Sequence, residues 1–195
     1  TKILKEKREP MAKKLGAPFE GSFPITQTFG GDLVRYARFG LIGHNGVDYG
    51  LPCGTPLISA LTGIVKDTGN DPEGYGLWVR IFDPYQNLII IYAHLSEISQ
   101  NMNPGAQITK GDFVGKSGTS GFSTGCHLHF GVADTDSFGN KINRENGYDG
   151  WKDPLDTNFV TFGEEPAIGG RTAAAVTTPQ PVPVSVTPPP YAPNV

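Results

Sequence analysis

Gly125-Cys126-His127-Leu128-His129-Phe130 is the stretch around which the rest of the chain is organised. In an extended strand the side chains at positions i and i+2 point to the same face, so His127 and His129 aim two imidazoles at one point. Cys126 points to the opposite face of such a strand and is not expected to join them. Two convergent imidazoles indicate a metal site.

A second cluster, His44-Asn45-Gly46-Val47-Asp48, places a histidine and a carboxylate four residues apart. The Asn-Gly pair within it disfavours a helix, so we expect a strand or a tight loop. The fourth histidine, His94, ends an apolar segment that begins at Leu88. No histidine lies outside these three segments, so chance placement is a poor account of the set.

The fold class follows from composition and turn signals. The 195 residues include 26 Gly and 17 Pro, with few apolar runs at helical period, which predicts a mainly β domain of short strands joined by many turns. The run Leu88-Ile89-Ile90-Ile91-Tyr92 has no polar alternation, so we expect an inner strand that is buried on both faces. One helical turn is predicted at residues 96–99.

Both ends of the chain differ from its middle. Residues 1–16 carry six basic and two acidic side chains, whereas residues 172–195 carry no charged side chain and hold seven of the 17 prolines. A proline-rich segment of that kind cannot bury enough apolar surface to offset its ordering entropy, so we expect it to be extended. We therefore predict a basic arm over 1–18, a globular domain over 19–163 and a proline-rich tail over 164–195, with protein partners holding the arm and the tail in a larger assembly.

Several classes of protein are disfavoured. A net charge of -3 and a pI near 5.8 give no reason to expect a nucleic-acid partner. No stretch approaches the roughly 18 to 20 apolar residues of a membrane span, and no signal sequence opens the given chain. The two cysteines, Cys53 and Cys126, are too few for a disulfide framework or a cysteine zinc cluster, and we expect free thiols rather than a disulfide.

Three ordered motifs carry a resemblance to a known family. His44-x-x-x-Asp48, Tyr92-Ala93-His94-Leu95 and Ser123-Thr124-Gly125-Cys126-His127-Leu128-His129-Phe130 closely resemble the lysostaphin-type, LytM-like zinc metallopeptidases. The resemblance spans residues 24–155. It implies an antiparallel β-sheet core, sandwich-like or barrel-like, of the duplicated hybrid motif type, with extended N- and C-terminal arms. No His-Glu-x-x-His occurs, so a thermolysin-like helix is excluded as the source of activity.

The resemblance also assigns roles to the histidines. Spacing alone leaves it equally open whether His127 and His129 both bind metal. The resemblance implies one Zn2+ per chain held by His44, Asp48 and His129, with a water in the fourth position. It assigns His94 and His127 to catalysis, where imidazole suits proton transfer near neutral pH.

The implied function is a zinc-dependent endopeptidase that hydrolyses peptide cross-links of bacterial peptidoglycan. It would act outside the cell, in the periplasm or cell wall, or as part of a virion. The alternative is a structural or binding component of a virion tail or cell-envelope complex that retains the peptidase fold.

The chain departs from the family pattern near the motifs. Many members have Pro and Glu where Cys126 and Gly131 stand here, which we expect to alter packing rather than metal binding. Tyr36 and Arg38 are the nearby candidates for stabilising an oxyanion, and the sequence does not choose between them or identify the cross-link that is cut.

Overall fold

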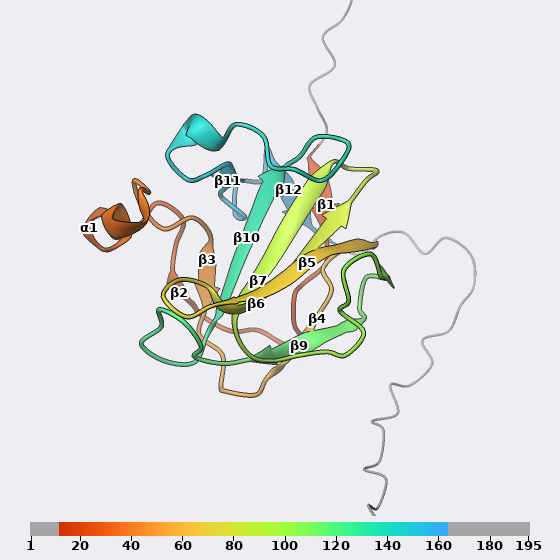
Figure 1. The fold of residues 1–195 in the computed structure, drawn as a ribbon, viewed down its shortest axis with the longest axis horizontal. Helices are drawn as coiled ribbons and strands as arrows, with labels where there is room; N and C mark the ends of the chain where they lie inside the picture. Colours follow the sequence, from red (N-terminus) through yellow and green to blue (C-terminus); the bar gives the residue numbers. More distant parts are fainter. Residues whose placement is uncertain (1–11, 164–195) are drawn as a thin grey trace, which may run out of the picture. The chain divides into compact units, whose positions relative to one another are not determined.

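The computed structural model describes residues 12–163, and β-strands dominate this part of the chain (Figure 1), which confirms the mainly β prediction. The helical elements are α1 (Leu33–Tyr36) and the 3-10 helices η1 (Ala37–Phe39) and η2 (Arg144–Asn146). The strands are β1 (Lys13–Leu15), β2 (Ile25–Gln27), β3 (Val47–Tyr49), β4 (Pro56–Ile58), β5 (Gly63–Asp71), β6 (Gly76–Asp83), β7 (Leu88–Ile98), β8 (Gln107–Ile108), β9 (Phe113–Ser117), β10 (Leu128–Asp134), β11 (Trp151–Lys152) and β12 (Val160–Phe162).

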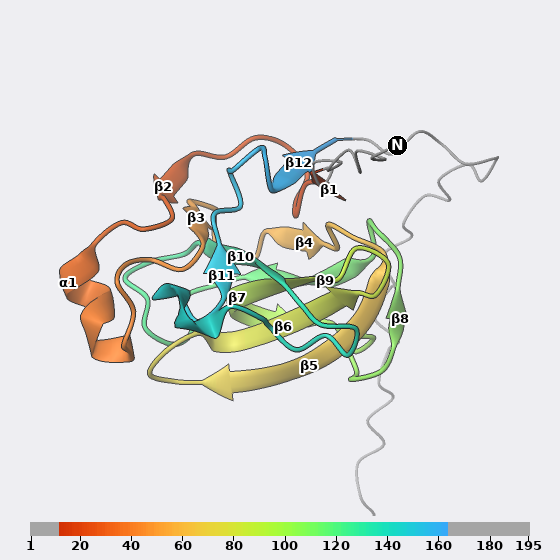
Figure 2. The same ribbon diagram turned by 90° about the horizontal axis from the view of Figure 1, so that it is seen from above.

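Ten of these strands form one antiparallel sheet. Its main path runs β2-β3-β10-β7-β6-β5-β8, while β11 pairs with β10, and β9 pairs with both β7 and β4. Figure 2 shows β5, β6 and β7 side by side, with β9 and β4 continuing beyond them. The antiparallel pairing and the curved, barrel-like sheet agree with the predicted architecture.

Strand β7 is the inner strand that its apolar run predicts. It pairs with β10 on one side and β6 on the other, and alternate side chains enter two separate apolar clusters. Ile90 and Tyr92 belong to the larger cluster, whereas Ile89 and Ile91 belong to the smaller one. Both faces of β7 are therefore covered, which explains why the run has no polar alternation.

The helical turn predicted at residues 96–99 is wrong. Strand β7 continues to Ile98 because its last residues pair with β9, with Leu95 opposite Ser117 and Ile98 opposite Gly115. This long-range pairing overrides the local turn preference of the serines.

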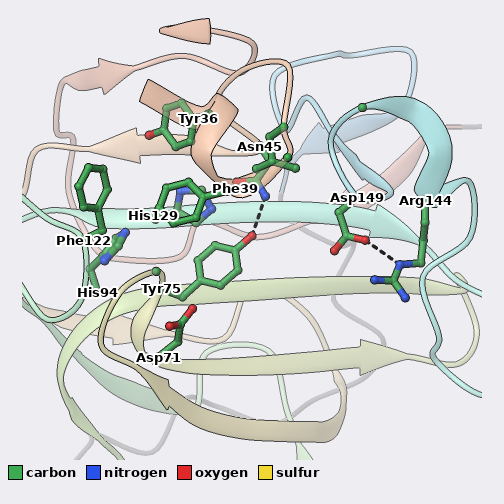
Figure 3. Close-up of a pocket in the computed structure, with 14 residues that line it drawn as sticks. Tyr36, Phe39, Asn45, Asp71, Tyr75, His94, Phe122, His129, Arg144 and Asp149 are labelled. Atoms are coloured by element: carbon green, nitrogen blue, oxygen red, sulfur yellow. Dashed lines mark hydrogen bonds and ion pairs between the residues drawn. The ribbon is translucent and has the colours of Figure 1, made fainter. Parts of the chain in front are cut away.

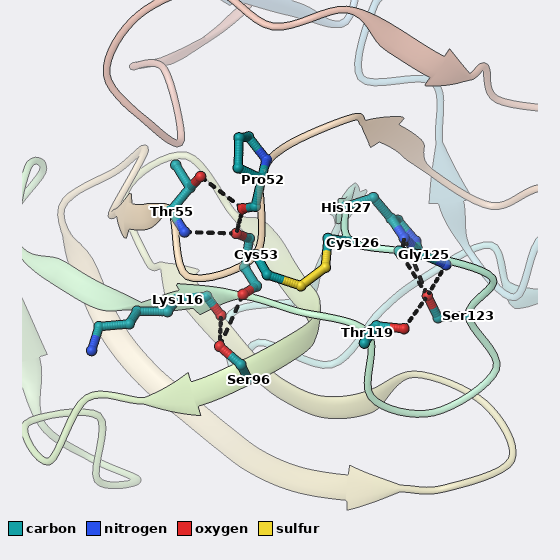
Figure 4. The surroundings of a disulfide bond; sticks show 11 residues. Pro52, Cys53, Thr55, Ser96, Lys116, Thr119, Ser123, Gly125, Cys126 and His127 are labelled. Carbon is teal, nitrogen blue, oxygen red and sulfur yellow. Dashed lines mark hydrogen bonds between the residues drawn. A yellow bond between two sulfur atoms is a disulfide. The ribbon is translucent and has the colours of Figure 1, made fainter.

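The prediction of free thiols is also wrong, because Cys53 and Cys126 form a disulfide, with their Cα atoms 5.1 Å apart. The bond joins the segment between β3 and β4 to the segment before β10 (Figure 4). The two cysteines are separated by 73 positions along the chain, so sequence spacing alone gave no sign that they meet.

The end of the predicted basic arm is part of the sheet structure. Residues 13–15 form β1, which pairs in parallel with β12, and Leu15 is buried. Lys13 and Lys152 each place a side-chain nitrogen 2.5 Å from the Asp134 carboxylate. The rest of the arm and the proline-rich tail lie outside the described residues, so the domain limits remain predictions. No helix among residues 12–163 combines the length and apolar character that crossing a membrane requires.

The ion pairs of Asp134 predict a pH-dependent contribution to stability. Burial opposes ionisation of Asp134, but its hydrogen bonds with Lys13 and Lys152 outweigh burial and hold the pKa of this carboxyl below its usual value. A depressed folded-state pKa stabilises the fold above the unfolded pKa, and this stabilisation is lost as pH falls through the folded pKa. Asp134→Asn should therefore lower the free energy of unfolding by about 1 kcal/mol at pH 7 and by clearly less near pH 3.

Urea unfolding of wild type and variant at the two pH values measures this difference. Glu20→Gln, which neutralises an exposed carboxylate, is the matched control and should change little at either pH. A deficit of equal size at pH 7 and pH 3 would contradict the electrostatic origin.

Candidate metal centre

Three side chains from two strands and one loop meet at a single point. The Nε2 atom of His44 lies 2.8 Å from Nδ1 of His129 and 3.1 Å from Oδ1 of Asp48, and Nδ1 of His129 also lies 3.1 Å from that oxygen. All three residues are buried. They form a group of metal-ligating type that includes neither His94 nor His127.

Sheet register brings these ligands together. His129 in β10 stands directly opposite Asp48 in β3 across an antiparallel pair, which places their side chains on the same face. His44 precedes β3 in a non-helical segment, as its Asn-Gly pair predicts. Its backbone is held by two hydrogen bonds with the glycine turn, from Gly30 N–H to the His44 carbonyl at 2.7 Å and from His44 N–H to the Gly31 carbonyl at 2.8 Å.

The hydrogen bonds of His44 fix which nitrogen can bind a metal. Its Nδ1 atom lies 3.1 Å from the backbone carbonyl of Thr28. A carbonyl oxygen only accepts, so Nδ1–H is the donor and Nε2 keeps a free electron pair that faces Asp48 and His129. Ligand histidines in metalloproteins are oriented in the same way by their second nitrogen.

Electrostatics show that this cluster suits a cation. Burial opposes ionisation of Asp48, but its close contacts with the rings of His129 and His44 outweigh burial and hold the pKa of Asp48 far below its usual value. Burial lowers the pKa of His129, which favours the neutral ring that a metal ligand requires. One carboxylate and two neutral imidazole nitrogens repel one another at about 3 Å unless a cation lies among them. The donor set therefore fits a divalent metal such as zinc, with a fourth position open.

The other two histidines form a second pair beside this cluster. The rings of His94 and His127 have centroids 4.6 Å apart, and Nε2 of His127 lies 3.7 Å from Oδ2 of Asp48. The Nδ1 atom of His94 lies 2.8 Å from the Ser120 carbonyl, and that of His127 lies 2.8 Å from the Gly125 carbonyl. Both rings therefore donate through Nδ1 and present Nε2 as the atom free to accept a proton.

His94 occupies a strained position in the middle of β7. Its φ of 59° is left-handed, which is uncommon for a residue other than glycine. The strand bulges here, since Tyr92 stands opposite Val79 while Leu95 stands opposite Leu77. The bulge re-aims the ring, and such strain is typical of functional sites. Burial, followed by the proximity of His129 and His127, lowers the pKa of His94 to about 3, so the ring is neutral at pH 7.

A cavity of about 510 Å³ opens beside these histidines (Figure 3). His94 and His129 contribute to its wall, together with Tyr36, Phe39, Gly40, Leu41, Asn45, Asp71, Gly74, Tyr75, Phe122, Arg144, Gly147 and Asp149. Figure 3 shows Tyr75 and Asn45 joined by a hydrogen bond beside His129, with a donor–acceptor distance of 2.6 Å. A cavity of this size can accept part of a peptide.

Four aromatic residues, Tyr75, Trp78, Tyr85 and Phe122, differ in their positions relative to the cavity. Tyr75 and Phe122 line the cavity, whereas Trp78 packs against the smaller apolar cluster and Tyr85 is 95% exposed. Asn45 was not singled out by its sequence, although its place next to His44 was the one available signal. Only the fold shows that Tyr75 reaches it.

The two oxyanion candidates differ in position. Tyr36 lines the cavity with its ring centroid 5.1 Å from that of His44, and its hydroxyl donates to Gln27. Arg38 instead stacks on the rings of Phe39 and Phe122, at 5.2 and 4.9 Å from their centroids. Tyr36 is therefore the better placed of the two.

The fold and the buried His-Asp-His cluster define a metallopeptidase. A family model described as "Peptidase family M23" matches residues 42–143, and the chain belongs to this family. The match contains all five candidate site residues, and it confirms the resemblance drawn from the three motifs.

Relatives and solved structures agree with this assignment. The chain is 30% identical over 113 residues to the peptidoglycan DD-endopeptidase ShyA of Vibrio cholerae, which covers 58% of this chain and 25% of that protein. A zinc-containing peptidase from Vibrio cholerae matches with a TM-score of 0.53 at 26% identity, covering 62% of this chain and 37% of that one. The structure of lysostaphin from Staphylococcus simulans has a TM-score of 0.54 at 23% identity over 68% of this chain and 48% of its own, a likeness of fold alone. The chain thus spans about a quarter of the length of ShyA.

Gly46 offers a test of how tightly His129 is held. A Cβ atom at residue 46 would lie 2.6 Å from the His129 ring and 2.7 Å from the Phe130 carbonyl. Because the ring is buried, it cannot move aside without leaving the cluster. Gly46→Ala should therefore weaken zinc binding at least about tenfold, in the range seen when ligand orientation is disturbed.

Competition with a chromophoric chelator measures the affinity. Gly163→Ala adds a methyl group where nothing lies within 4 Å, and it should bind zinc like wild type. Equal zinc affinity for Gly46→Ala and wild type would show that His129 is not a ligand constrained in this way.

Proposed function

We propose that this domain is a zinc-dependent endopeptidase that hydrolyses peptide cross-links of bacterial peptidoglycan. The observation that carries the proposal is the convergence of His44, Asp48 and His129 beside two histidines that donate through Nδ1 and keep Nε2 free. The name of the ShyA relative and the cavity beside the cluster support the substrate class. Family members can differ in the cross-link that they cut, and we expect the residues that line the cavity to determine which cross-link is cut here.

The residues that would hold zinc are His44 through Nε2, Asp48 through Oδ1 and His129 through Nδ1. Zinc bound there would lower the pKa of a water molecule and polarise the carbonyl of the scissile peptide. The carboxylate and the two neutral imidazoles give a singly charged ligand set, and the open fourth position is that of a catalytic rather than a structural site.

Proton transfer falls to His127 and His94. Each ring has Nδ1–H tied to a backbone carbonyl, so the free Nε2 atom can take a proton from the attacking water and later give one to the leaving amine. A ring that carries the proton gains stabilisation from Asp48, whose carboxylate lies 3.7 Å from Nε2 of His127. His94 lines the cavity directly, so its ring also limits where the peptide can lie.

The location that fits this proposal is outside the cytoplasm. The Cys53–Cys126 disulfide is the type of bond that persists in oxidising compartments. Peptidoglycan also lies in such compartments, so a secreted, periplasmic or virion-associated enzyme would meet both conditions. The alternative of a purely structural component draws its support from the arm and the tail, most of which lie outside the described residues.

The proposed division of the two histidines in His127-Leu128-His129 predicts unequal phenotypes. His129→Ala should lose both zinc and activity, because it removes a buried ligand and one of the two rings that face Asp48 Oδ1. His127→Ala should keep about one zinc per chain and lose activity by about 10²- to 10⁴-fold, the usual contribution of a positioned acid–base group.

Metal analysis after zinc-replete preparation and zymography on purified peptidoglycan measure the two properties. Tyr85→Ala changes a fully exposed aromatic side chain and should match wild type in both assays. Equal zinc loss in His127→Ala and His129→Ala would refute the division, and a zinc-loaded wild type that clears no peptidoglycan would refute the function.

A further inference from the structure

The Cys53–Cys126 disulfide ends one residue before His127, and the proposed catalytic chemistry does not use it. Figure 4 shows the sulfur bridge reaching across to the segment that carries His127. Cys53 is exposed and Cys126 is partly exposed, so the bond is not part of the apolar core. Its place beside a proposed catalytic side chain raises the question of what it holds.

The Cys53 end of the bridge is fixed to the sheet. Ser117, at the end of β9, is completely buried, and its hydroxyl donates to the Pro52 carbonyl at 2.6 Å and accepts from Thr55 N–H at 3.0 Å. Backbone hydrogen bonds also join Gly54 and Thr55 to Ser117, at 2.9 and 3.0 Å. The turn that carries Cys53 is therefore a rigid anchor.

The segment before His127 has two halves, residues 120–122 and residues 123–126, that differ in their hydrogen bonds to the rest of the domain. In the first half, Ser120 bonds to Leu77 N–H and to the Leu95 carbonyl, and Phe122 N–H bonds to the Gly74 carbonyl. In the second half, residues 123–126, the hydrogen bonds found among the described residues run to other residues of 119–127. Among the described residues, the disulfide is the cross-link that joins this second half to a segment outside 119–127.

Residues 123–126 determine the tautomer and the position of the His127 ring. The Gly125 carbonyl accepts from Nδ1–H of His127 at 2.8 Å, which fixes the tautomer and leaves Nε2 facing Asp48. The side chain of Ser123 lies 3.4 Å from the same nitrogen. If residues 123–126 moved, His127 would lose both the partner that sets its tautomer and the backbone position that aims its ring.

We propose that the Cys53–Cys126 disulfide positions His127 for catalysis, and that Cys53 and Cys126 are positioning residues of this peptidase. The bridge joins Cys126, the residue before His127, to the turn that hydrogen bonds with Ser117 hold in place. The zinc ligands do not depend on it, because His129 is held by β10 pairing and His44 by Thr28. The inference rests on the proposed function, and it predicts a defect in turnover that leaves zinc binding and substrate binding intact.

The test compares oxidised wild type, dithiothreitol-treated wild type and Cys53→Ser/Cys126→Ser, all zinc-loaded. Dithiothreitol delivers two electrons and two protons to the bond, giving two thiols while the reagent closes its own disulfide; mass spectrometry after alkylation counts the thiols. The reductant also binds zinc, so it is removed under argon and zinc content is measured before assay. The readouts are kcat and KM on a soluble cross-linked muropeptide, and hydrogen exchange of peptides covering residues 118–127.

We expect kcat to fall at least about tenfold in both opened forms, since a displacement of about 1 Å can cost as much as 10²-fold. KM and zinc content should stay within twofold of wild type, and hydrogen exchange should speed up in 118–127 but not in β7. Reoxidation should restore kcat to the wild type and not to the double variant. Val160→Ala, which truncates a buried residue of β12, lowers stability without touching the bridge and should keep wild-type kcat.

Three results would overturn the inference. They are an unchanged kcat in a form shown to carry two thiols, an unchanged hydrogen exchange in 118–127, or a fall in kcat that Val160→Ala reproduces. If the double variant does not fold, reduced wild type decides the outcome, since thiols at both positions keep the native side-chain volume. If oxidised wild type cleaves no muropeptide, the proposed function fails, and hydrogen exchange still decides whether the bridge holds residues 123–127.

Discussion

The register of β10 is the constraint on which the rest of the site depends. This strand lies between β3 and β7, so His129 stands opposite Asp48 on one side and opposite Ala93, the neighbour of His94, on the other. A slip of one residue would turn His129 to the other face and remove it from Asp48 and His44. The buried side chains of β10, which include Phe130 and Val132, prevent that slip because they would also lose their place in the core.

Backbone carbonyls in the loops orient the histidine rings that the sheet register brings together. Three of the four histidines, His44, His94 and His127, have Nδ1 within about 3 Å of a backbone carbonyl, and those carbonyls belong to Thr28, Ser120 and Gly125. A carbonyl partner fixes a ring's tautomer without adding charge, so Asp48 remains the carboxylate that faces the cluster. The strands thus set where the imidazoles lie, while the loops set which nitrogen each one offers.

The sequence predicted the features that depend on local pattern. The unbroken apolar run at 88–92 predicted an inner strand, and His44, Asp48 and His129 could be proposed as a set because their motifs resembled a family. Their roles in binding metal and in catalysis remain proposals, although the fold brings all five side chains together.

What the sequence could not predict depends on contacts between distant segments. The pairing of β7 with β9 extends a strand through a serine-containing stretch that locally favours a turn. The disulfide joins positions that only the folded sheet brings within reach, and the Asn45–Tyr75 hydrogen bond spans two loops whose sequences carry no sign of each other. In each case the information lies in the topology and not in residue spacing.

The contrast between His129 and His127 shows why one site needs two kinds of support. His129 lies within β10, and the same backbone hydrogen bonds that stabilise the domain also hold this ligand. His127 lies just before the strand, at an isolated bridge with Gly118, where loop motion would otherwise be expected. The disulfide at Cys126 ties the backbone before His127 to a rigid turn and leaves the His127 ring partly exposed beside Asp48.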